Sequence, residues 1–200
     1  MNSVDFTEML RELRLPVFTI DTASSIIQKP KPYTRLFINR LRRKNLISMV
    51  ERGRYCLRGT DDYTLASRII PDSYLTGYAA LEHYGFTTQI PTKLSVVAAK
   101  YHRSLRLAGH TVVFSKVKKE FIYGFTITSS GPAFAEPEKI FIDDLYLHGR
   151  QLFGEEFALA VSMGRLDLKK LERYAQMSGN KALLKKMRGL IQAAGTNMLR

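Results

Sequence analysis

The first part of the chain carries apolar residues at helical spacing, in two short stretches. The first stretch predicts a helix that ends near Leu15 and Pro16, because a proline stops a helix shortly after its last periodic position. Its apolar stripe consists of Phe6, Met9, Leu10 and Leu13. The second stretch predicts a shorter helix that Asp21 or Thr22 could cap. Its inward residues are Ala23, Ile26 and Ile27.

A third helix and a hairpin follow. Residues 29–34 contain two prolines and predict a turn, because proline cannot continue a helix. The third helix is expected from about Tyr33 to Asn45. Its inner side would carry Phe37, Ile38 and Leu41, and its outer side Arg35, Asn39, Arg42 and Arg43. Residues 46–57 predict two short strands joined by a turn at Arg52-Gly53-Arg54.

Three helices followed by a basic hairpin are the parts of a winged helix-turn-helix domain. We expect this domain to cover residues 1–60. Its boundary would lie near Gly59 and Thr60, because Asp61 and Asp62 then change the charge of the chain.

Residues 61–200 contain both strand and helix patterns and no repeat. The strand patterns are residues 93–100, 111–117 and 122–130. The helical patterns are residues 63–70, 74–86, 136–149, 155–164, 166–176 and 180–195. In the second of these helices we expect Tyr78, Leu81 and Tyr84 to be buried. The fold class is therefore α+β, with a C-terminal α/β domain whose sheet is flanked by helices.

Positive charge is concentrated in one segment. The 200-residue chain has a formal net charge of +13. Between Lys29 and Arg58 there are ten Lys or Arg residues and one acid, Glu51, so this segment carries +9 and all other residues together carry +4. Such an excess favours a polyanionic partner, either nucleic acid or an anionic membrane surface.

Other features of the sequence favour the cytoplasm. No apolar run approaches the roughly 18 residues that cross a bilayer, and the N-terminal residues mix acidic and basic side chains, unlike a signal peptide. The single cysteine, Cys56, excludes an intrachain disulfide and suits a reducing cytosol. We therefore expect a cytoplasmic protein with no membrane partner.

The expected fold gives the arginines of the third helix a role. A helix fits the major groove of duplex DNA, where arginine binds guanine and asparagine binds adenine. Lysines beside the helix, including Lys29, would neutralise phosphates. Gly53 allows a tight turn that would lay Arg52 or Arg54 along the DNA backbone or in the minor groove. The candidate DNA-binding residues are Lys31, Tyr33, Arg35, Asn39, Arg42, Arg43, Lys44, Arg52 and Arg54.

These features also have plainer interpretations. The basic side could simply be solvated, and winged helices also serve as protein-interaction modules that would bind an acidic partner here. Arg40 could cover the core with its aliphatic stem. Tyr33 could pack at the start of the helix, and Tyr55 could anchor the hairpin strand.

The C-terminal domain shows little catalytic chemistry. Its histidines, with Cys56, lack metal-ligand spacing, and the chain has no glycine-rich phosphate loop or nucleophile elbow. One acidic cluster would suit an RNA-directed or nucleotidyl-transferring enzyme, and it consists of Glu136, Glu138, Asp143 and Asp144. A Lys139–Asp143 ion pair, on a helix that starts at Pro137, explains these carboxylates more simply. We therefore expect no enzyme, no catalytic residue, no metal and no cofactor.

Several segments of the chain resemble one family. They are PVFTIDTAS (residues 16–24), NRLRRKNLI with VERGRYCL (39–47 and 50–57), LASRIIPDSYLTGYAALEHYGFTTQIP (65–91) and AEPEKIFIDDLYL (135–147). Over about residues 16–147 the chain resembles the AbiEi family of bacterial and archaeal antitoxins and transcriptional regulators. The segments at residues 73–86 and 138–147 are the more specific ones, since a basic helix with a hairpin is common to many families.

The resemblance implies an N-terminal winged helix joined to a C-terminal antitoxin domain in a type IV toxin–antitoxin system. It implies autorepression at inverted repeats upstream of the operon, which two copies of the chain would bind. It also implies a nucleotidyltransferase-like toxin that the antitoxin counters without a stable complex. By position, the family's DNA contacts fall on the third helix and the hairpin. The alternative is a stand-alone regulator with no cognate toxin.

Overall fold

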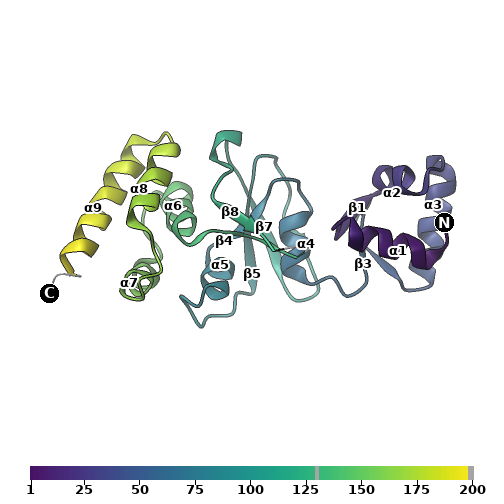
Figure 1. Cartoon of the computed structure of the whole chain (residues 1–200), viewed down its shortest axis with the longest axis horizontal. Helices are drawn as coiled ribbons and strands as arrows, with labels where there is room; N and C mark the ends of the chain where they lie inside the picture. Colours follow the sequence, from purple (N-terminus) through teal and green to yellow (C-terminus); the bar gives the residue numbers. More distant parts are fainter. Residues whose placement is uncertain (129–130, 198–200) are drawn as a thin grey trace.

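Two sheets organise the chain, and they belong to different parts of it (Figure 1). The computed structural model describes residues 1–128 and 131–197. An N-terminal part with a small sheet lies at one end of the long axis, a larger sheet occupies the middle, and helices of the C-terminal region lie at the other end. The protein is therefore α+β, as the sequence predicts, and the larger sheet is mixed.

The N-terminal part contains helices and short strands. Its elements are α1 (Ser3–Glu12), β1 (Val17–Thr19), α2 (Ile20–Ile27), α3 (Lys31–Arg43), β2 (Ile47–Glu51) and β3 (Arg54–Leu57). The strands pair antiparallel in the order β1-β3-β2, and the turn between β2 and β3 confirms the predicted hairpin. β1 has no counterpart in the sequence prediction, because three residues are too few to show an alternating pattern.

The starts of α2 and α3 differ from the prediction. Thr19 caps α2 in place of Asp21 or Thr22, because its hydroxyl accepts a hydrogen bond from the Thr22 N–H at 3.2 Å. α3 begins at Lys31, so the predicted turn through both prolines is partly wrong. The second proline is tolerated because backbone N–H groups in the first turn of a helix have no intrahelical partner.

A cluster of apolar side chains forms the core of the N-terminal part. Its buried members are Phe6, Leu10, Phe18, Ala23, Ile27, Ile38, Leu41 and Ile47. The Phe6 ring meets the rings of Phe18 and Phe37 edge to face, with centroids 5.7 and 5.4 Å apart. Leu13, predicted to join this core, is 50% exposed, because α1 ends at Glu12 and the chain then turns away.

The second sheet is mixed and has the strand order β6-β7-β5-β4-β9-β8. Its strands are β4 (Tyr74–Thr76), β5 (Lys93–Ala98), β6 (Leu105–Arg106), β7 (Thr111–Lys116), β8 (Phe125–Ile127) and β9 (Ala133–Ala135). The pairs β5–β7 and β4–β9 are parallel, and the other neighbours are antiparallel. The three predicted strands correspond to β5, β7 and β8, although residues 129–130 of the third prediction lie outside the described residues.

Helices cover both sides of this sheet (Figure 1). The helices that follow the N-terminal part are α4 (Asp62–Arg68), α5 (Tyr78–His83), α6 (Pro137–His148), α7 (Gly154–Ser162), α8 (Leu168–Met177) and α9 (Lys181–Asn197), with a short 3-10 helix at Lys119–Phe121. α4 lies on the side nearest the N-terminal part, and α6 lies on the other side, where it also packs against α8 and α9. Residues 138–145 of α6 are consequently all buried, and Pro137 starts the helix as predicted. Within the described chain, none of the helices combines the length and the apolar character that crossing a membrane requires.

The predicted helix over residues 74–86 is partly wrong, because β4 occupies its first residues. All three residues of β4 are buried, so they show no alternation that would mark a strand. The helix begins only after Gly77, whose φ of +63° interrupts the chain between the two elements. Leu81 is buried as predicted, whereas Tyr84 is half-buried and Tyr78 is 37% exposed.

Candidate nucleic-acid interface

α3 turns one side to the core and the other to solvent. Thr34, Ile38 and Leu41 are buried, and Phe37 is half-buried. The Thr34 hydroxyl donates to the Lys29 carbonyl oxygen at 3.2 Å and so fixes the start of the helix. The predicted inner side of α3 is therefore confirmed, and Thr34 extends it.

The outer side of α3 is basic and exposed. Its exposed polar residues are Arg35, Asn39, Arg40, Arg42 and Arg43, with Lys44 at the C-cap. Among the described residues, none of these side chains has a hydrogen-bond or ion-pair partner. Arg40, for which packing over the core is the alternative, is exposed like its neighbours. The side therefore offers several positive charges that no carboxylate of the described chain neutralises.

An apolar residue, Leu36, lies within this basic side. Its exposed fraction is 61%, and Tyr33, one turn earlier, is 49% exposed. At 100° per residue, Leu36 shares the helix surface with Asn39 and Arg40. The sequence analysis did not identify Leu36 as an exposed residue of this surface. Its helical position, outside the side that carries the buried residues, is the feature that could have shown it. The exposed part of the Tyr33 side chain is accessible to a partner.

Lys31 lies in the first turn of α3, where its Nζ is 3.0 Å from Asp21 Oδ1. The two side chains are 56% and 72% exposed, and exposed ion pairs contribute only about 0–1 kcal/mol. A phosphate that approached Lys31 would therefore displace the Asp21 carboxylate at little cost.

The hairpin tip separates the two arginines predicted there. Arg52 is exposed next to Gly53, whose φ of +82° belongs to the left-handed region that the turn requires. Arg54 forms an ion pair with Glu51, and its side chain is 34% exposed. Arg52 is therefore exposed to solvent without an ion-pair partner among the described residues, whereas Arg54 pairs with Glu51 across the turn.

Glu51 also joins the hairpin to the second part of the chain. His102 Nε2 lies 3.1 Å from Glu51 Oε1, and the His102 ring packs on Phe114 with centroids 4.5 Å apart. Burial raises the pKa of Glu51, but hydrogen bonds and charges from His102 and Arg54 outweigh it and lower this pKa below its ordinary value. Val50 packs beside them on a buried cluster of the second part. That cluster consists of Ile69, Ile70 and Ala98.

Lys139 and Asp143 of α6 form the ion pair that their spacing predicts, and both side chains are buried. The Lys139 ammonium also lies over the rings of Phe121 and Tyr123, at 3.5 and 4.7 Å from their centroids. Burial lowers the pKa of Lys139 and raises the pKa of Asp143, and the opposite charge of each partner counteracts the shift of the other. This pair joins α6 to the aromatic residues that precede β8.

The other carboxylates of the acidic cluster also have protein partners. Glu136 and Glu138 lie 3.1 and 3.0 Å from the ammonium of Lys170 on α8. Asp144 accepts hydrogen bonds at 2.7 and 3.2 Å from two backbone N–H groups just before α7. These carboxylates therefore connect α6 to α8 and to the segment before α7.

The histidines are engaged in separate contacts. His83 stacks on Phe134 with ring centroids 4.1 Å apart, and His110 Nδ1 lies 2.8 Å from Asp62 Oδ2. His148 bonds to an aspartate of its own helix at 3.1 Å. In the described part of the chain, no group of His, Cys, Asp and Glu side chains is arranged to hold a metal ion.

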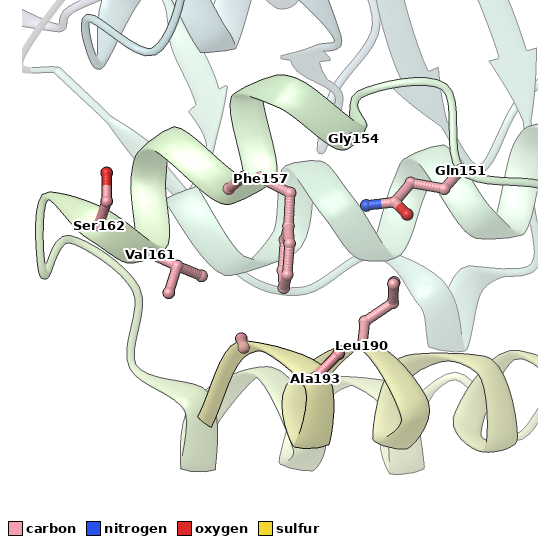
Figure 2. A pocket seen from close by; sticks show the side chains of 9 residues that line it. Gln151, Gly154, Phe157, Val161, Ser162, Leu190 and Ala193 are labelled. Carbon is pink, nitrogen blue, oxygen red and sulfur yellow. The ribbon is translucent and has the colours of Figure 1, made fainter. Parts of the chain in front are cut away.

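A cavity of about 450 Å³ lies between α7 and α9 (Figure 2). Phe157 projects from α7 toward α9, where Leu190 and Ala193 form the opposite wall. Among the described residues that line this cavity, the polar side chains are Gln151 and Ser162, and none is charged.

Comparison with models of known protein families gives no match, and comparison with curated proteins gives none either.

Proposed function

We propose that residues 1–60 are a winged helix-turn-helix domain that binds duplex DNA, with α3 in the major groove. The observation that supports this most is the outer side of α3, where exposed arginines and Asn39 have no partner among the described residues. Arginines that lie close together on one side of a helix repel one another. A bound polyanion removes this repulsion by neutralising their charges.

Each group on this surface has a proposed role. Arg35, Asn39 and Arg42 would bind base edges, because arginine and asparagine can each form two hydrogen bonds with guanine and adenine, respectively. Lysines at the two ends of α3, together with Arg43 and Tyr33, would contact phosphates and set the position of the helix. Arg52 would contact the DNA backbone beside the groove. Arg54, which is paired with Glu51, would act indirectly by fixing the hairpin.

We further propose that residues 61–200 form an AbiEi-like antitoxin or regulatory domain, and that the protein represses its own operon. The sequence resemblance supports this role, and an inverted-repeat operator would bind two copies of the chain. In a type IV system the toxin would be nucleotidyltransferase-like and would be countered without a stable complex. The alternative is a stand-alone regulator, and the gene next to this one distinguishes the two.

The proposal is tested by measuring binding to the promoter region of the protein's own gene. Fluorescence anisotropy with that duplex and with a random duplex of equal length would give the specificity ratio at two or more salt concentrations. We expect a footprint over an inverted repeat and an affinity at least a thousandfold higher than for the random duplex, the order usual for specific DNA binding. Equal affinities with no footprint would contradict the proposal.

Exposed Leu36 and Tyr33 favour one second candidate, a protein-interaction module. An acidic protein partner would use the same arginines, and its apolar side chains would cover these two residues. Such a module would bind the promoter no better than random DNA, so the same measurement separates the two functions.

A further inference from the structure

α7 carries apolar residues on the side that faces solvent as well as on the side that faces the core. Its inner residues are buried, yet Leu159 on the outer side is 43% exposed and Met163, which ends the helix, is 41% exposed. The charged residues of α7 are Glu155 and Glu156, both in the first turn. Because a helix that is apolar on all sides is usually buried, the outer side of α7 is a candidate contact surface.

The cavity of Figure 2 adjoins this outer side. Ala158, which precedes Leu159 in the chain, is exposed and lines the cavity on the α7 side. On the α9 side, Ala193 is exposed and Leu190 is half-buried. These five residues, with Met163, form one apolar surface that we call the α7–α9 face. A continuous apolar surface of this kind marks an interaction site more often than single exposed apolar residues do.

Charges of opposite sign lie on the two helices of the α7–α9 face. The charged residues of α9 are all basic, and they are Lys181, Lys185, Lys186 and Arg188. Lys186 is exposed one turn before Leu190, and its ammonium bonds to the Gly149 carbonyl oxygen. Gly154, the neighbour of Glu155, lies at the same end of the cavity as Leu190 (Figure 2). Glu155 is exposed and has no partner among the described residues.

The α7–α9 face therefore suits an occupant that is apolar along one side and acidic at the end where Lys186 lies. The outer side of α7 has both properties, because Leu159 and Met163 follow Glu155 along the helix. A surface that contains both the groove and a helix that fits it is complementary to itself. Self-complementarity is the requirement for a two-fold contact between identical chains.

We propose that the α7–α9 face binds the same face of a second copy of this chain. In this two-fold dimer, α7 of each copy lies over the cavity between α7 and α9 of the other. Leu159 covers the apolar walls of that cavity, and Glu155 approaches Lys186 of the second copy. Apolar burial stabilises the contact, and the opposite charges fix its orientation.

This pairing does not depend on DNA binding. The α7–α9 face and α3 lie at opposite ends of the long axis of the molecule (Figure 1), so the dimer leaves both α3 helices exposed. A chain that failed to pair in this way could still bind an operator, and a chain that failed to bind DNA could still form this dimer.

Sedimentation velocity and light scattering of the full chain without DNA test the proposal. We expect a reversible equilibrium between monomer and dimer as the chain is concentrated through the micromolar range. Leu159→Lys should weaken the dimer about tenfold or more, because it places an ammonium against apolar walls. Ile90→Lys is the matched control, since Ile90 is 76% exposed and lies outside this face, and it should leave the equilibrium unchanged.

Charge reversal tests the orientation. Glu155→Lys and Lys186→Glu should each weaken the dimer roughly three- to tenfold, because each variant brings like charges together across the contact. The two substitutions combined should restore most of the affinity, because opposite charges then face each other again. Lys181→Glu, at the exposed start of α9 and outside the cavity, should have no such effect.

Three results would overturn the proposal. One is a chain that stays monomeric at the highest concentration, which would mean that a different molecule covers the α7–α9 face. Another is a dimer that Leu159→Lys leaves intact, since the contact would then lie elsewhere on the chain. The third is a double charge reversal that is weaker than either single variant, because Glu155 and Lys186 would then not face each other.

Discussion

His102 Nε2 lies 3.1 Å from Glu51 Oε1, and this contact joins two parts of the chain that have separate sheets. Glu51 ends β2 and pairs with Arg54 at the start of β3, so the turn that carries Arg52 lies beside the second part of the molecule. In the proposed function, the C-terminal domain therefore helps to orient one of the DNA contacts.

Replacing Glu51 with Gln should loosen this junction. At neutral pH we expect Glu51→Gln to lower the free energy of unfolding by about 0.5–1 kcal/mol, because the charged contacts to His102 and Arg54 are weakened. Chemical denaturation would measure this loss, and hydrogen exchange would show faster exchange of β2 and β3 amides. Glu8→Gln, at an exposed position of α1, is the control and should change neither.

The same junction should depend on pH. The folded-state pKa of Glu51 lies below its ordinary value of 4.5, so its contribution is present above that pH and is lost as the pH falls through the folded-state pKa. The stability difference between the native chain and Glu51→Gln should therefore shrink below pH 4.5. A difference that stayed constant across the acid range would contradict this assignment.

Arg35→Ala and Arg42→Ala should each reduce affinity for the cognate operator by about 1–3 kcal/mol and relax its specificity. Both side chains are exposed and unpaired among the described residues, so the fold should be unaffected. Anisotropy titrations with operator and random duplex measure the effect. Arg106→Ala on β6, also exposed, is the control and should retain full affinity.

The two hairpin arginines should behave differently. Arg52→Ala should weaken operator and random DNA about equally and reduce the salt dependence by about one unit, as expected for a phosphate contact. Arg54→Ala should lower the free energy of unfolding by about 0.5–1 kcal/mol, because Glu51 loses one of its two side-chain partners and keeps only His102. Arg35→Ala and Arg42→Ala should differ from Arg52→Ala in this respect. If all three weakened operator and random DNA equally, the division into base-reading helix and backbone-binding hairpin would be wrong.

Leu36→Ala should weaken operator binding by about 1 kcal/mol without affecting stability, because its side chain is 61% exposed and can contact a thymine methyl group in the major groove. Replacing individual operator thymines with deoxyuridine removes those methyl groups and should reproduce the loss at one position. In Leu36→Ala, the same replacement should have no further effect. Additive losses would mean that Leu36 contacts something else.

Lys139→Ala should lower the free energy of unfolding by about 3–5 kcal/mol, because it leaves the buried Asp143 carboxylate unpaired. The double substitution Lys139→Met with Asp143→Leu should recover most of that loss, since apolar residues of similar size can replace a buried ion pair. Urea denaturation of the three chains measures both effects. A double variant as unstable as Lys139→Ala would show that the loss comes from packing rather than from an unpaired charge.

The sequence alone predicts those features that depend on residues close together in the chain. The inner side of α3, the turn at Gly53 and the Lys139–Asp143 pair each depend on residues within a few positions of one another, so spacing and turn chemistry predict them. The concentration of positive charge between Lys29 and Arg58 is likewise a property of the sequence alone.

Local patterns did not predict the contacts between segments that are distant in the sequence. Leu13 has the spacing of a core residue but lies in a turn, and the buried strand β4 looks like part of a helix, because apolar character alone does not distinguish these environments. Only the tertiary structure places His102 beside Glu51. Glu51 also pairs with Arg54, and Arg52 stays exposed. The same packing brings Phe157 of α7 and Leu190 of α9 to one cavity. Periodicity reports which side of an element is buried, but only the packed fold determines which side chains, separated along the chain, share a hydrogen bond or a cavity.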